Sequence, residues 1–374
     1  MKYYLVVGER SGDLHASNLM KSLLEEDKQA QFRFYGGDYM KEVGGELVQH
    51  YSTVSFMGVW EVVKNLRTIK GHIKKCQEDL YKYEPDTVIL VDFSAFNLKI
   101  ARYAKEKGIR VCYYISPKVW AWNTKRAYKV KKYVDHLFCI LPFEKTFFKK
   151  YDYEVDYIGN PLLDALEAFT PNPDFSSVNG LSTAPIIAVL PGSRYQEVKA
   201  MLERMLEITS YYPDHQFVVA GVGNLNSQLY KNVESSQVKV VYNQTYDVLA
   251  NAEMAIVTSG TATLETALFE VPQVVGYRTS FITALIAKLV LKIPYVSLVN
   301  LVAEKEIVKE LLQYDFTASK LKKELNKIKV DGEKRAEVLK SYKEMKTKMG
   351  QAGVSKRTAQ LIRKYVTSSN DTSY

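Results

Sequence analysis

The stretch "VVGERSGDLHAS" (residues 6–17) joins an apolar run to a polar, glycine-containing segment near the start of the chain. The run from Tyr3 to Val7 is typical of a buried strand, and the residues from Ala16 to Glu26 have helical periodicity. A strand, a turn and a helix in this order begin a doubly wound α/β domain. The turn has neither the G-x-G-x-x-G spacing nor a G-K-[ST] ending, which disfavours a dinucleotide or ATP cradle.

The alternation of strand and helix continues along the chain. Buried strands are predicted at 87–93, 111–116 and 136–142, and in the second half at "IIAVLP", "QFVVAGV", "VKVVY", "MAIVTSG" and "PQVVGYR". Helical patterns lie between these runs, so we expect an α/β protein with two doubly wound, Rossmann-like domains. Such sheets bind ligands at the carboxyl ends of their strands, which predicts a site in a cleft between the two domains.

The domain boundaries follow from a shift in composition near the middle of the chain. The segment "FTPNPDFSSVNGLSTAP" is rich in Pro, Ser, Asn and Gly and is typical of a linker. We therefore expect domains at 1–168 and 186–345, joined by a linker at 169–185. The remaining residues, 346–374, are expected to form a basic helical tail that packs back on the N-terminal domain.

The composition is that of a globular protein. Of the 374 residues, 47% are hydrophobic and 25% are charged, which predicts packed cores. No apolar stretch approaches the roughly 20 residues that span a bilayer, and the run at 3–7 is too short for a secretory signal. We therefore expect a cytoplasmic protein. The three cysteines have no metal-ligand spacing, and structural burial is their expected fate.

The net charge of +9 suggests an anionic partner. Basic residues gather at 64–75, at 125–132 and from Lys320 onward. Nucleic acid, an anionic membrane surface and a phosphorylated substrate would each explain such runs. Solvated helix faces explain them equally well, so the charge alone does not choose a partner.

Polar residues with catalytic chemistry follow two predicted strands of the first half. Glu9, Ser11 and Asp13 lie in the turn after the first strand, and Asp92 ends the apolar run "VILVDF". A carboxylate at such a position is costly unless it caps a helix, binds a charged partner or faces a site. Asp92 is therefore a candidate general base, with Asp13 as its rival.

Two strand–helix junctions of the second half combine small residues with a charged group. In "LPGSRYQEV", Gly192 and Ser193 form a turn, and the Arg194 guanidinium beyond it can pair bidentately with a diphosphate. In "SGTATLE", small residues permit the close approach of phosphate oxygens, and a carboxylate can accept both hydroxyls of a ribose. The residues of this second junction are Ser259, Gly260, Thr261 and Glu265.

A stretch between residues 57 and 75 combines apolar residues at helical spacing with cations. This pattern is typical of an interfacial helix on anionic lipid, although helices of this kind more often pack into their own domain. The apolar residues are Met57, Val59, Trp60, Val62, Val63, Leu66 and Ile69.

Together these segments resemble lipid-A-disaccharide synthase, a family of inverting GT-B-type glycosyltransferases. The resemblance rests on "GERSGDLHA", "SFMGVWEVV", "VDFSAFN", "YYISPKVWAWNTKR", "LPFEKTFF", "IGNPLLD", "LPGSRYQEV", "SGTATLE", "VVGYR" and "YVSLVNL", which occur in the family's order. Positions 94, 95 and 160 depart from the commoner pattern, so no catalytic role is assigned to them. Asp92 is retained.

The resemblance implies transfer of 2,3-diacylglucosamine from UDP to 2,3-diacylglucosamine 1-phosphate, which gives a β-1,6-linked disaccharide. Asp92 would be the base, Arg194 would contact the diphosphate, and Asn300 would line the donor site. The substrates are lipid-linked sugars, so the protein is expected peripherally on the cytoplasmic face of the inner membrane. No cofactor is expected, and the absence of a D-x-D sequence disfavours a metal chelated in that way.

Two other functions remain open at this point. Another GT-B sugar-nucleotide enzyme, such as a UDP-N-acetylglucosamine epimerase, would share the donor half but need no lipid-binding helix. A basic RNA-binding protein would use the mixed Trp and Lys residues of "SPKVWAWNTKRAYKVKK", although the family resemblance implies no nucleic acid partner.

Overall fold

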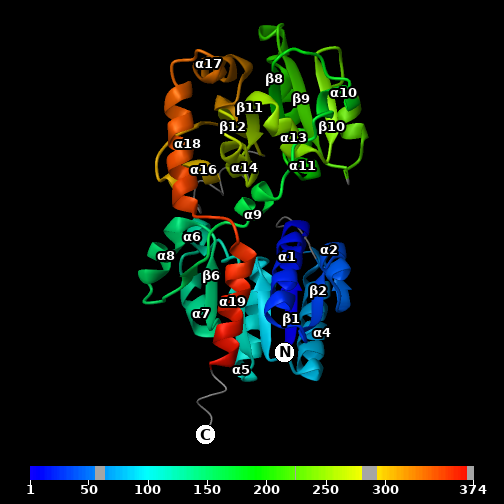
Figure 1. Cartoon of the computed structure of the whole chain (residues 1–374), viewed down its shortest axis with the longest axis vertical. Helices are drawn as coiled ribbons and strands as arrows, with labels where there is room; N and C mark the ends of the chain where they lie inside the picture. Colours follow the sequence, from blue (N-terminus) through cyan, green and yellow to red (C-terminus); the bar gives the residue numbers. More distant parts are fainter. Residues whose placement is uncertain (55–63, 224, 280–292, 369–374) are drawn as a thin grey trace. The chain divides into compact units, whose positions relative to one another are not determined.

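The computed structural model describes residues 1–54, 64–223, 225–279 and 293–368. The chain forms two compact units, of which the first combines Met1–Asp164 with Gly350–Tyr374 and the second is Ala165–Met349 (Figure 1). Each unit is built around a parallel sheet. The α/β class and the doubly wound pattern predicted from the sequence are confirmed.

The sheet of the first unit has the order β3-β2-β1-β4-β5-β6-β7, with every pair parallel. Its central strands β1 and β4 are apolar runs that are buried on both faces, as parallel strands require. The strands are β1 (Lys2–Val7), β2 (Gln31–Gly36), β3 (Glu46–His50), β4 (Thr87–Val91), β5 (Arg110–Tyr114), β6 (His136–Cys139) and β7 (Asp156–Tyr157).

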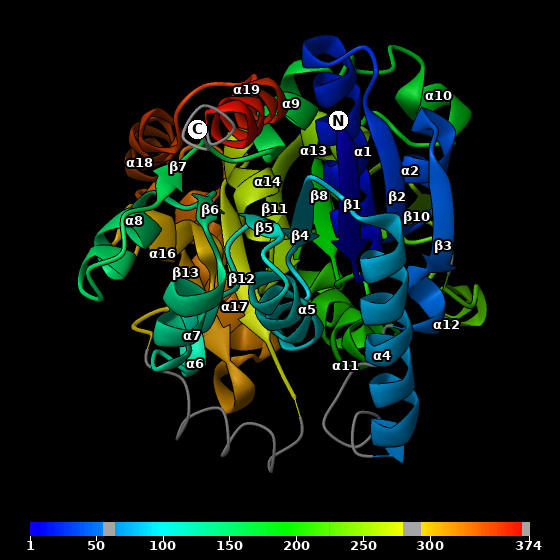
Figure 2. The ribbon, with the colours of Figure 1, turned by 90° about the horizontal axis from the view of Figure 1, so that it is seen from below.

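Helices cover both faces of this sheet (Figure 2). Successive residues of a strand point to opposite faces, so Tyr4 packs with α4, α5 and α7 whereas Leu5 packs with α1 and α19. Cys76, Cys112 and Cys139 are buried between these layers. The helices are α1 (Arg10–Glu26), α2 (Asp38–Val43), α4 (Leu66–Tyr83), α5 (Ser94–Glu106), α6 (Val119–Trp122), α7 (Arg126–Tyr133), α8 (Pro142–Lys149), α9 (Leu162–Glu167) and α19 (Val354–Thr367).

The C-terminal tail is divided between the units. Helix α18 (Arg335–Met349) belongs to the second unit, and α19 packs on α1 in the first. Gly350 and Gly353 both have positive φ and separate the two helices, because a left-handed backbone ends a helix. The Asp164 carboxylate accepts main-chain N–H groups at the start of α19, which fixes the returning chain.

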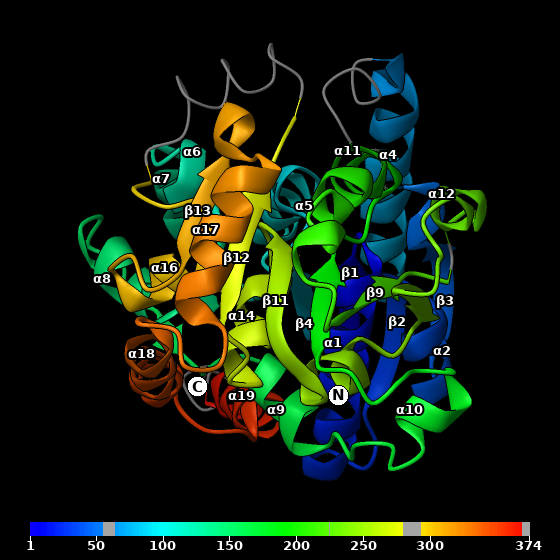
Figure 3. The ribbon, with the colours of Figure 1, turned by 90° about the horizontal axis from the view of Figure 1, so that it is seen from above.

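The second unit has a six-stranded parallel sheet with the order β10-β9-β8-β11-β12-β13 (Figure 3). Its strands are β8 (Ile186–Leu190), β9 (Gln216–Gly221), β10 (Val238–Tyr242), β11 (Ala252–Thr258), β12 (Gln273–Tyr277) and β13 (Lys309–Leu312). Its other helices are α10 (Phe175–Val178), α11 (Tyr195–Leu206), α12 (Gln228–Lys231), α13 (Thr245–Ala250), α14 (Ala262–Leu268), α16 (Leu298–Ala303) and α17 (Ala318–Ile328).

The segment 169–185, expected to be a linker, belongs structurally to the second unit. It contains α10, and Phe175 is buried in the core with residues of β8 and α13. An aromatic side chain amid Pro, Ser and Asn anchors the segment, so the boundary between the units falls at Asp164 instead.

Among the described residues, no helix is both long enough and apolar enough to cross a membrane. The strand order reverses between β1 and β4 in the first unit and between β8 and β11 in the second. Open α/β sheets bind ligands at such switch points, outside the carboxyl ends of the strands. The loops after β1 and β4 in the first unit, and those after β8 and β11 in the second, are therefore where each unit is expected to bind a ligand.

Candidate functional site

The switch point of the first unit brings the turn after β1 against the turn after β4. A Cβ atom on Gly8 would overlap the ring of Phe93, so a glycine is required where the two turns meet. Phe93 directly follows Asp92, and α1 and α5 begin just beyond the two turns. Glu9, Ser11 and Asp92, which the sequence predicted as site residues, therefore lie at one edge of the sheet.

Asp92 lies on a strained turn. Its φ is +44° and that of Phe93 is +45°, a left-handed backbone that non-glycine residues seldom adopt. The Asn97 amide fixes this turn by donating to the carbonyl oxygens of Val6, Val91 and Asp92, at 3.3, 3.2 and 2.9 Å. Strain of this kind clusters at functional sites. The Asp92 side chain is partly exposed at the end of β4.

Asp13 has a different environment. It is only 1% exposed, and its carboxylate accepts N–H groups from Gly37 at 2.7 Å and Tyr39 at 3.0 Å. These donors belong to the first turn of α2, so Asp13 caps that helix from α1. Burial raises the pKa of Asp13, while the main-chain hydrogen bonds oppose the rise. The Asp13 carboxylate is thus enclosed in the domain.

Glu9 and Ser11 remain near the surface of the same turn. The Ser11 hydroxyl donates to Glu9 Oε1 at 3.1 Å, and the Arg10 guanidinium donates to the Tyr39 hydroxyl. Glu9 is partly exposed and Ser11 is exposed. Both side chains are therefore available to a polar ligand.

The segment after β5 is anchored by a buried carboxylate that the sequence analysis missed. Glu144 of α8 is 1% exposed and accepts the Trp120 indole N–H at 3.0 Å. It also accepts the N–H groups of Ile140 and Leu141, at 3.1 and 2.9 Å. A glutamate two residues after Pro142 at a helix start was the available signal, because this position commonly reaches back to cap the helix. Burial raises the pKa of Glu144 to about 7.

The raised pKa of Glu144 predicts a pH-dependent stability. The folded protein retains the proton up to about pH 7, whereas an ordinary glutamate releases it near pH 4.5. Ionisation of Glu144 therefore destabilises the fold as the pH rises through this interval. We expect the difference in unfolding free energy between the wild type and Glu144→Gln to fall by about 3 kcal/mol from pH 4.5 to 7 in urea titrations. A difference that stays constant would contradict this environment for Glu144.

In the second unit, the turn after β8 is organised around Glu197. Gly192 has a φ of +113°, and a Cβ there would overlap the Glu197 side chain. Glu197 accepts the main-chain N–H of Ser193 and the Arg194 guanidinium, both at 3.2 Å. The Arg194 side chain is 57% exposed at the start of α11, so it can reach an anion outside the strand ends.

The turn after β11 lies beside the turn after β8, because the two strands are paired neighbours. Ser259 donates its hydroxyl to the carbonyl oxygen of Val296 at 2.9 Å, and Thr261 is exposed. Glu265 of α14 is partly exposed and accepts the Tyr246 hydroxyl at 3.2 Å. Burial raises the pKa of Glu265. The two predicted anion-binding junctions thus lie at one switch point.

Asn300 lies in the interior. Its side chain is fully buried, and its amide donates to the Val308 carbonyl oxygen and to Glu310 Oε1, each at 2.9 Å. Its carbonyl accepts the N–H groups of Ile307 and Val308. With both ends of the amide occupied, Asn300 fixes the chain that leads into β13, and its expected place in the donor site stays a prediction.

The apolar stretch between 57 and 75 is only partly described. Leu66 is 48% exposed at the start of α4, and Ile69 packs against the first unit's core. The other predicted apolar residues lie outside the described residues: Met57, Val59, Trp60, Val62 and Val63.

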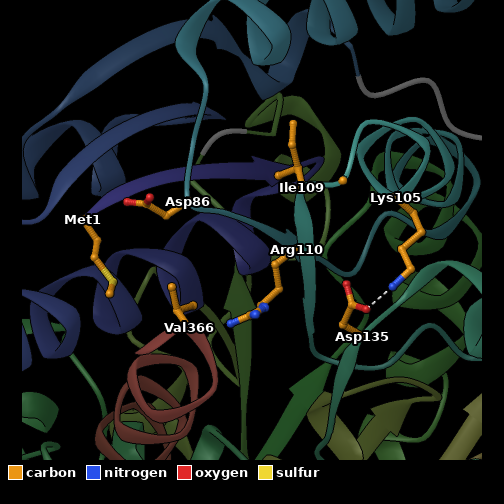
Figure 4. A pocket seen from close by; sticks show the side chains of 8 residues that line it. Met1, Asp86, Lys105, Ile109, Arg110, Asp135 and Val366 are labelled. Carbon is orange, nitrogen blue, oxygen red and sulfur yellow. Dashed lines mark hydrogen bonds and ion pairs between the residues drawn. The ribbon is translucent and has the colours of Figure 1, made fainter. Parts of the chain in front are cut away.

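A pocket of about 450 Å³ lies at the opposite edge of the first sheet, where β1, β4 and β5 begin (Figure 4). Its charged side chains already have partners within the unit. Lys105 pairs with Asp135, Arg110 donates to the Tyr365 carbonyl oxygen, and Asp86 accepts the Lys2 N–H. Its position away from the strand carboxyl ends separates this pocket from the candidate site.

Comparison with known proteins identifies the family. The family model described as lipid-A-disaccharide synthetase matches residues 3–365. The chain belongs to this family. Lipid-A-disaccharide synthase from Myxococcus xanthus is 35% identical over 370 residues, 96% of each chain, and that from Syntrophus aciditrophicus is 33% identical over 364 residues, 95% of each chain. Family membership supports a UDP-sugar glycosyltransferase that forms the lipid A disaccharide, and it does not favour an epimerase or an RNA-binding protein.

Solved structures share the fold at low sequence identity. UDP-GlcNAc 2-epimerase from Neisseria meningitidis bound to UDP-GlcNAc has a TM-score of 0.68 at 14% identity, covering 97% of this chain and all of the other. The glycotransferase of kitacinnamycin has a TM-score of 0.69 at 14% identity, covering 98% of this chain and 99% of the other. At these identities the likeness concerns the fold, and it confirms the predicted GT-B-type class.

Proposed function

We propose that the chain transfers 2,3-diacylglucosamine from UDP to the 6-hydroxyl of 2,3-diacylglucosamine 1-phosphate and forms a β-1,6 linkage with inversion. The observation that carries this proposal is the partly exposed Asp92 carboxylate, fixed on a strained turn at the switch point of the first unit. A general base must be held within hydrogen-bond reach of the hydroxyl that it deprotonates. The hydrogen bonds of Asn97 supply that fixed backbone.

The reaction is a single displacement. Asp92 accepts the proton of the acceptor's 6-hydroxyl as the oxygen attacks the anomeric carbon from the face opposite UDP. The carbon gains oxocarbenium character, the bond to UDP breaks, and the configuration inverts. Glu9 and Ser11 would bind sugar hydroxyls beside Asp92, because both remain accessible on the neighbouring turn.

The second unit would hold the donor's UDP. The Arg194 guanidinium matches two diphosphate oxygens and stabilises the charge that develops on the leaving group. Glu265 would accept ribose hydroxyls, and the turn residues would approach the phosphates closely. These turn residues are Gly192, Ser193, Ser259, Gly260 and Thr261. Neither a cofactor nor a metal ion is part of this proposal, since a guanidinium supplies the required positive charge.

The acyl chains of both substrates require an apolar surface, so we infer that the protein works peripherally on the cytoplasmic face of the inner membrane. Exposed Leu66 at the start of α4, followed by exposed Arg67 and Lys70, supports contact with an anionic lipid surface. Nucleic acid is not a proposed partner.

An assay of UDP release tests the proposed function. The protein is incubated with UDP-2,3-diacylglucosamine and 2,3-diacylglucosamine 1-phosphate, and both UDP and the lipid product are measured. We expect one disaccharide for each UDP released, and UDP release that depends on the acceptor. UDP release without disaccharide, or no release, would reject the proposal, and tight salt-sensitive binding of RNA in its place would favour the RNA-binding alternative.

A further inference from the structure

The turn between α6 and α7 places an arginine over a tryptophan ring. The Arg126 guanidinium carbon lies 4.3 Å from the centroid of a Trp122 ring, and Trp122 is 41% exposed. The main-chain N–H of Arg126 donates to the Asn123 carbonyl oxygen at 3.0 Å. This hydrogen bond closes the turn that brings the two side chains together. A guanidinium carries its N–H groups in one plane, a geometry that matches the oxygens of a phosphate.

Among the described residues, Arg126 lacks the acceptors that several other arginines of the first unit have. Arg33 pairs with Asp79 and Arg363 with Asp27. Within the described part of the chain, no oxygen accepts a hydrogen bond from the Arg126 guanidinium, and its Nη1 atom is buried without a partner. The rest of the side chain is partly exposed, so among the described residues no acceptor competes with an anion that reaches the accessible N–H groups.

The surroundings of the pair are cationic. Residues 117–134 contain six lysines and arginines and no acidic residue. Lys118 and Lys125, on either side of α6, are both exposed. The local charge therefore favours a ligand with more than one negative charge.

The pair lies at the same edge of the sheet as Asp92. It follows β5, which pairs in parallel with β4 so that Tyr114 is the partner of Val91, the residue before Asp92. Figure 1 shows α6 at the upper end of the first unit, beyond the strands. The segment is held in place because buried Glu144 binds Trp120, two residues before Trp122.

We propose that Arg126, supported by Trp122, forms the subsite for the phosphate of the acceptor. This inference rests on the proposed function, in which the acceptor is a sugar 1-phosphate whose 6-hydroxyl must reach Asp92. A phosphate monoester supplies the negative charge and the acceptor oxygens that complement the Arg126 guanidinium. Anchoring the phosphate at the end of β5 would orient the sugar toward the end of β4.

The test measures the KM for acceptor and donor separately, with both lipids in mixed detergent micelles. We expect Arg126→Ala to raise the acceptor KM about 10- to 100-fold, the usual effect of losing hydrogen bonds to a charged group. The donor KM should stay unchanged. Arg126→Lys should recover part of the loss, because it restores the charge without the planar fork. Lys149→Ala, which removes an exposed cation from the last turn of α8, outside residues 117–134, is the control and should behave as the wild type.

A second arm separates the acceptor's phosphate from a bilayer headgroup. Sedimentation with phosphatidylglycerol vesicles should be the same for Arg126→Ala and the wild type. Weaker sedimentation with an unchanged acceptor KM would assign the pair to phospholipid and overturn the inference. An equal rise in both KM values with a lower melting temperature would also overturn it, by showing a structural role. If the wild type forms no disaccharide, the proposed function fails; if it does and Arg126→Ala keeps a normal acceptor KM, only the subsite fails.

Discussion

Replacing Asp92 with Asn should lower kcat by about 1,000-fold, within the range expected for loss of a general base. The amide nearly preserves the shape of the carboxylate but cannot accept the proton of the attacking hydroxyl. Asn97 and Tyr113 hold the strained backbone through the main-chain carbonyl oxygen of Asp92, so these hydrogen bonds remain when the side chain is changed. Binding of UDP, measured by calorimetry, should therefore be unchanged.

Asp13→Asn is the control for this experiment. An amide oxygen cannot replace both carboxylate oxygens, so the capping of α2 is weakened and the free energy of unfolding should fall by about 1–3 kcal/mol. The residual kcat of the folded fraction should stay near that of the wild type. If Asp13→Asn abolishes turnover without destabilising the protein while Asp92→Asn remains active, Asp13 is the base and the assignment to Asp92 is wrong.

The arrangement of the two sheets was predictable because each buried strand leaves a local signal. Runs such as "TVILV" are continuous and apolar, since parallel strands are buried on both faces. The carboxyl end of each run then predicts the edge at which site residues lie. Asp92 and Arg194 were predicted in this way, from their position after a strand and their chemistry, and the structure places them after β4 and β8.

Residues whose roles depend on distant partners were not predictable from local pattern. Asp13 is polar and lies in a helix start, but its donors are at Gly37 and Tyr39 on another element. Asn300 lies in a motif of the family, but its side-chain amide forms hydrogen bonds with residues between 307 and 310, which the motif does not contain. Glu144 meets Trp120 across two loops. Sequence spacing gives no measure of these contacts, because the fold creates them.

The break in the C-terminal tail shows the same limit for element boundaries. The basic, amphipathic pattern from residue 341 to 366 continues through Gly350 and Gly353, so periodicity favours one helix. The structure has two, α18 and α19, because both glycines adopt positive φ and Asp164 caps the second helix. A cap supplied from a remote segment determines where α19 begins.

Replacing Arg194 with Ala should lower kcat/KM for the donor by about 100- to 1,000-fold, as expected when a preorganised positive group that stabilises a leaving group is lost. The Arg194 side chain is 57% exposed, and its pairing with Glu197 is an exposed ion pair that adds little to stability. The variant should therefore fold normally, and its melting temperature should match that of the wild type. Arg194→Lys should recover only part of the activity, because a lysine cannot pair bidentately with the diphosphate.

The matched control is Lys199→Ala, which removes an exposed cation from the same helix, α11, away from the turn after β8. Steady-state rates at varied UDP-sugar concentration should show the loss for Arg194→Ala and none for Lys199→Ala. Equal losses in both variants would indicate a general effect of net charge on the anionic substrate. An Arg194→Ala enzyme with unchanged donor kinetics would require the charge on departing UDP to be matched elsewhere, and the turn after β8 would no longer be the diphosphate site.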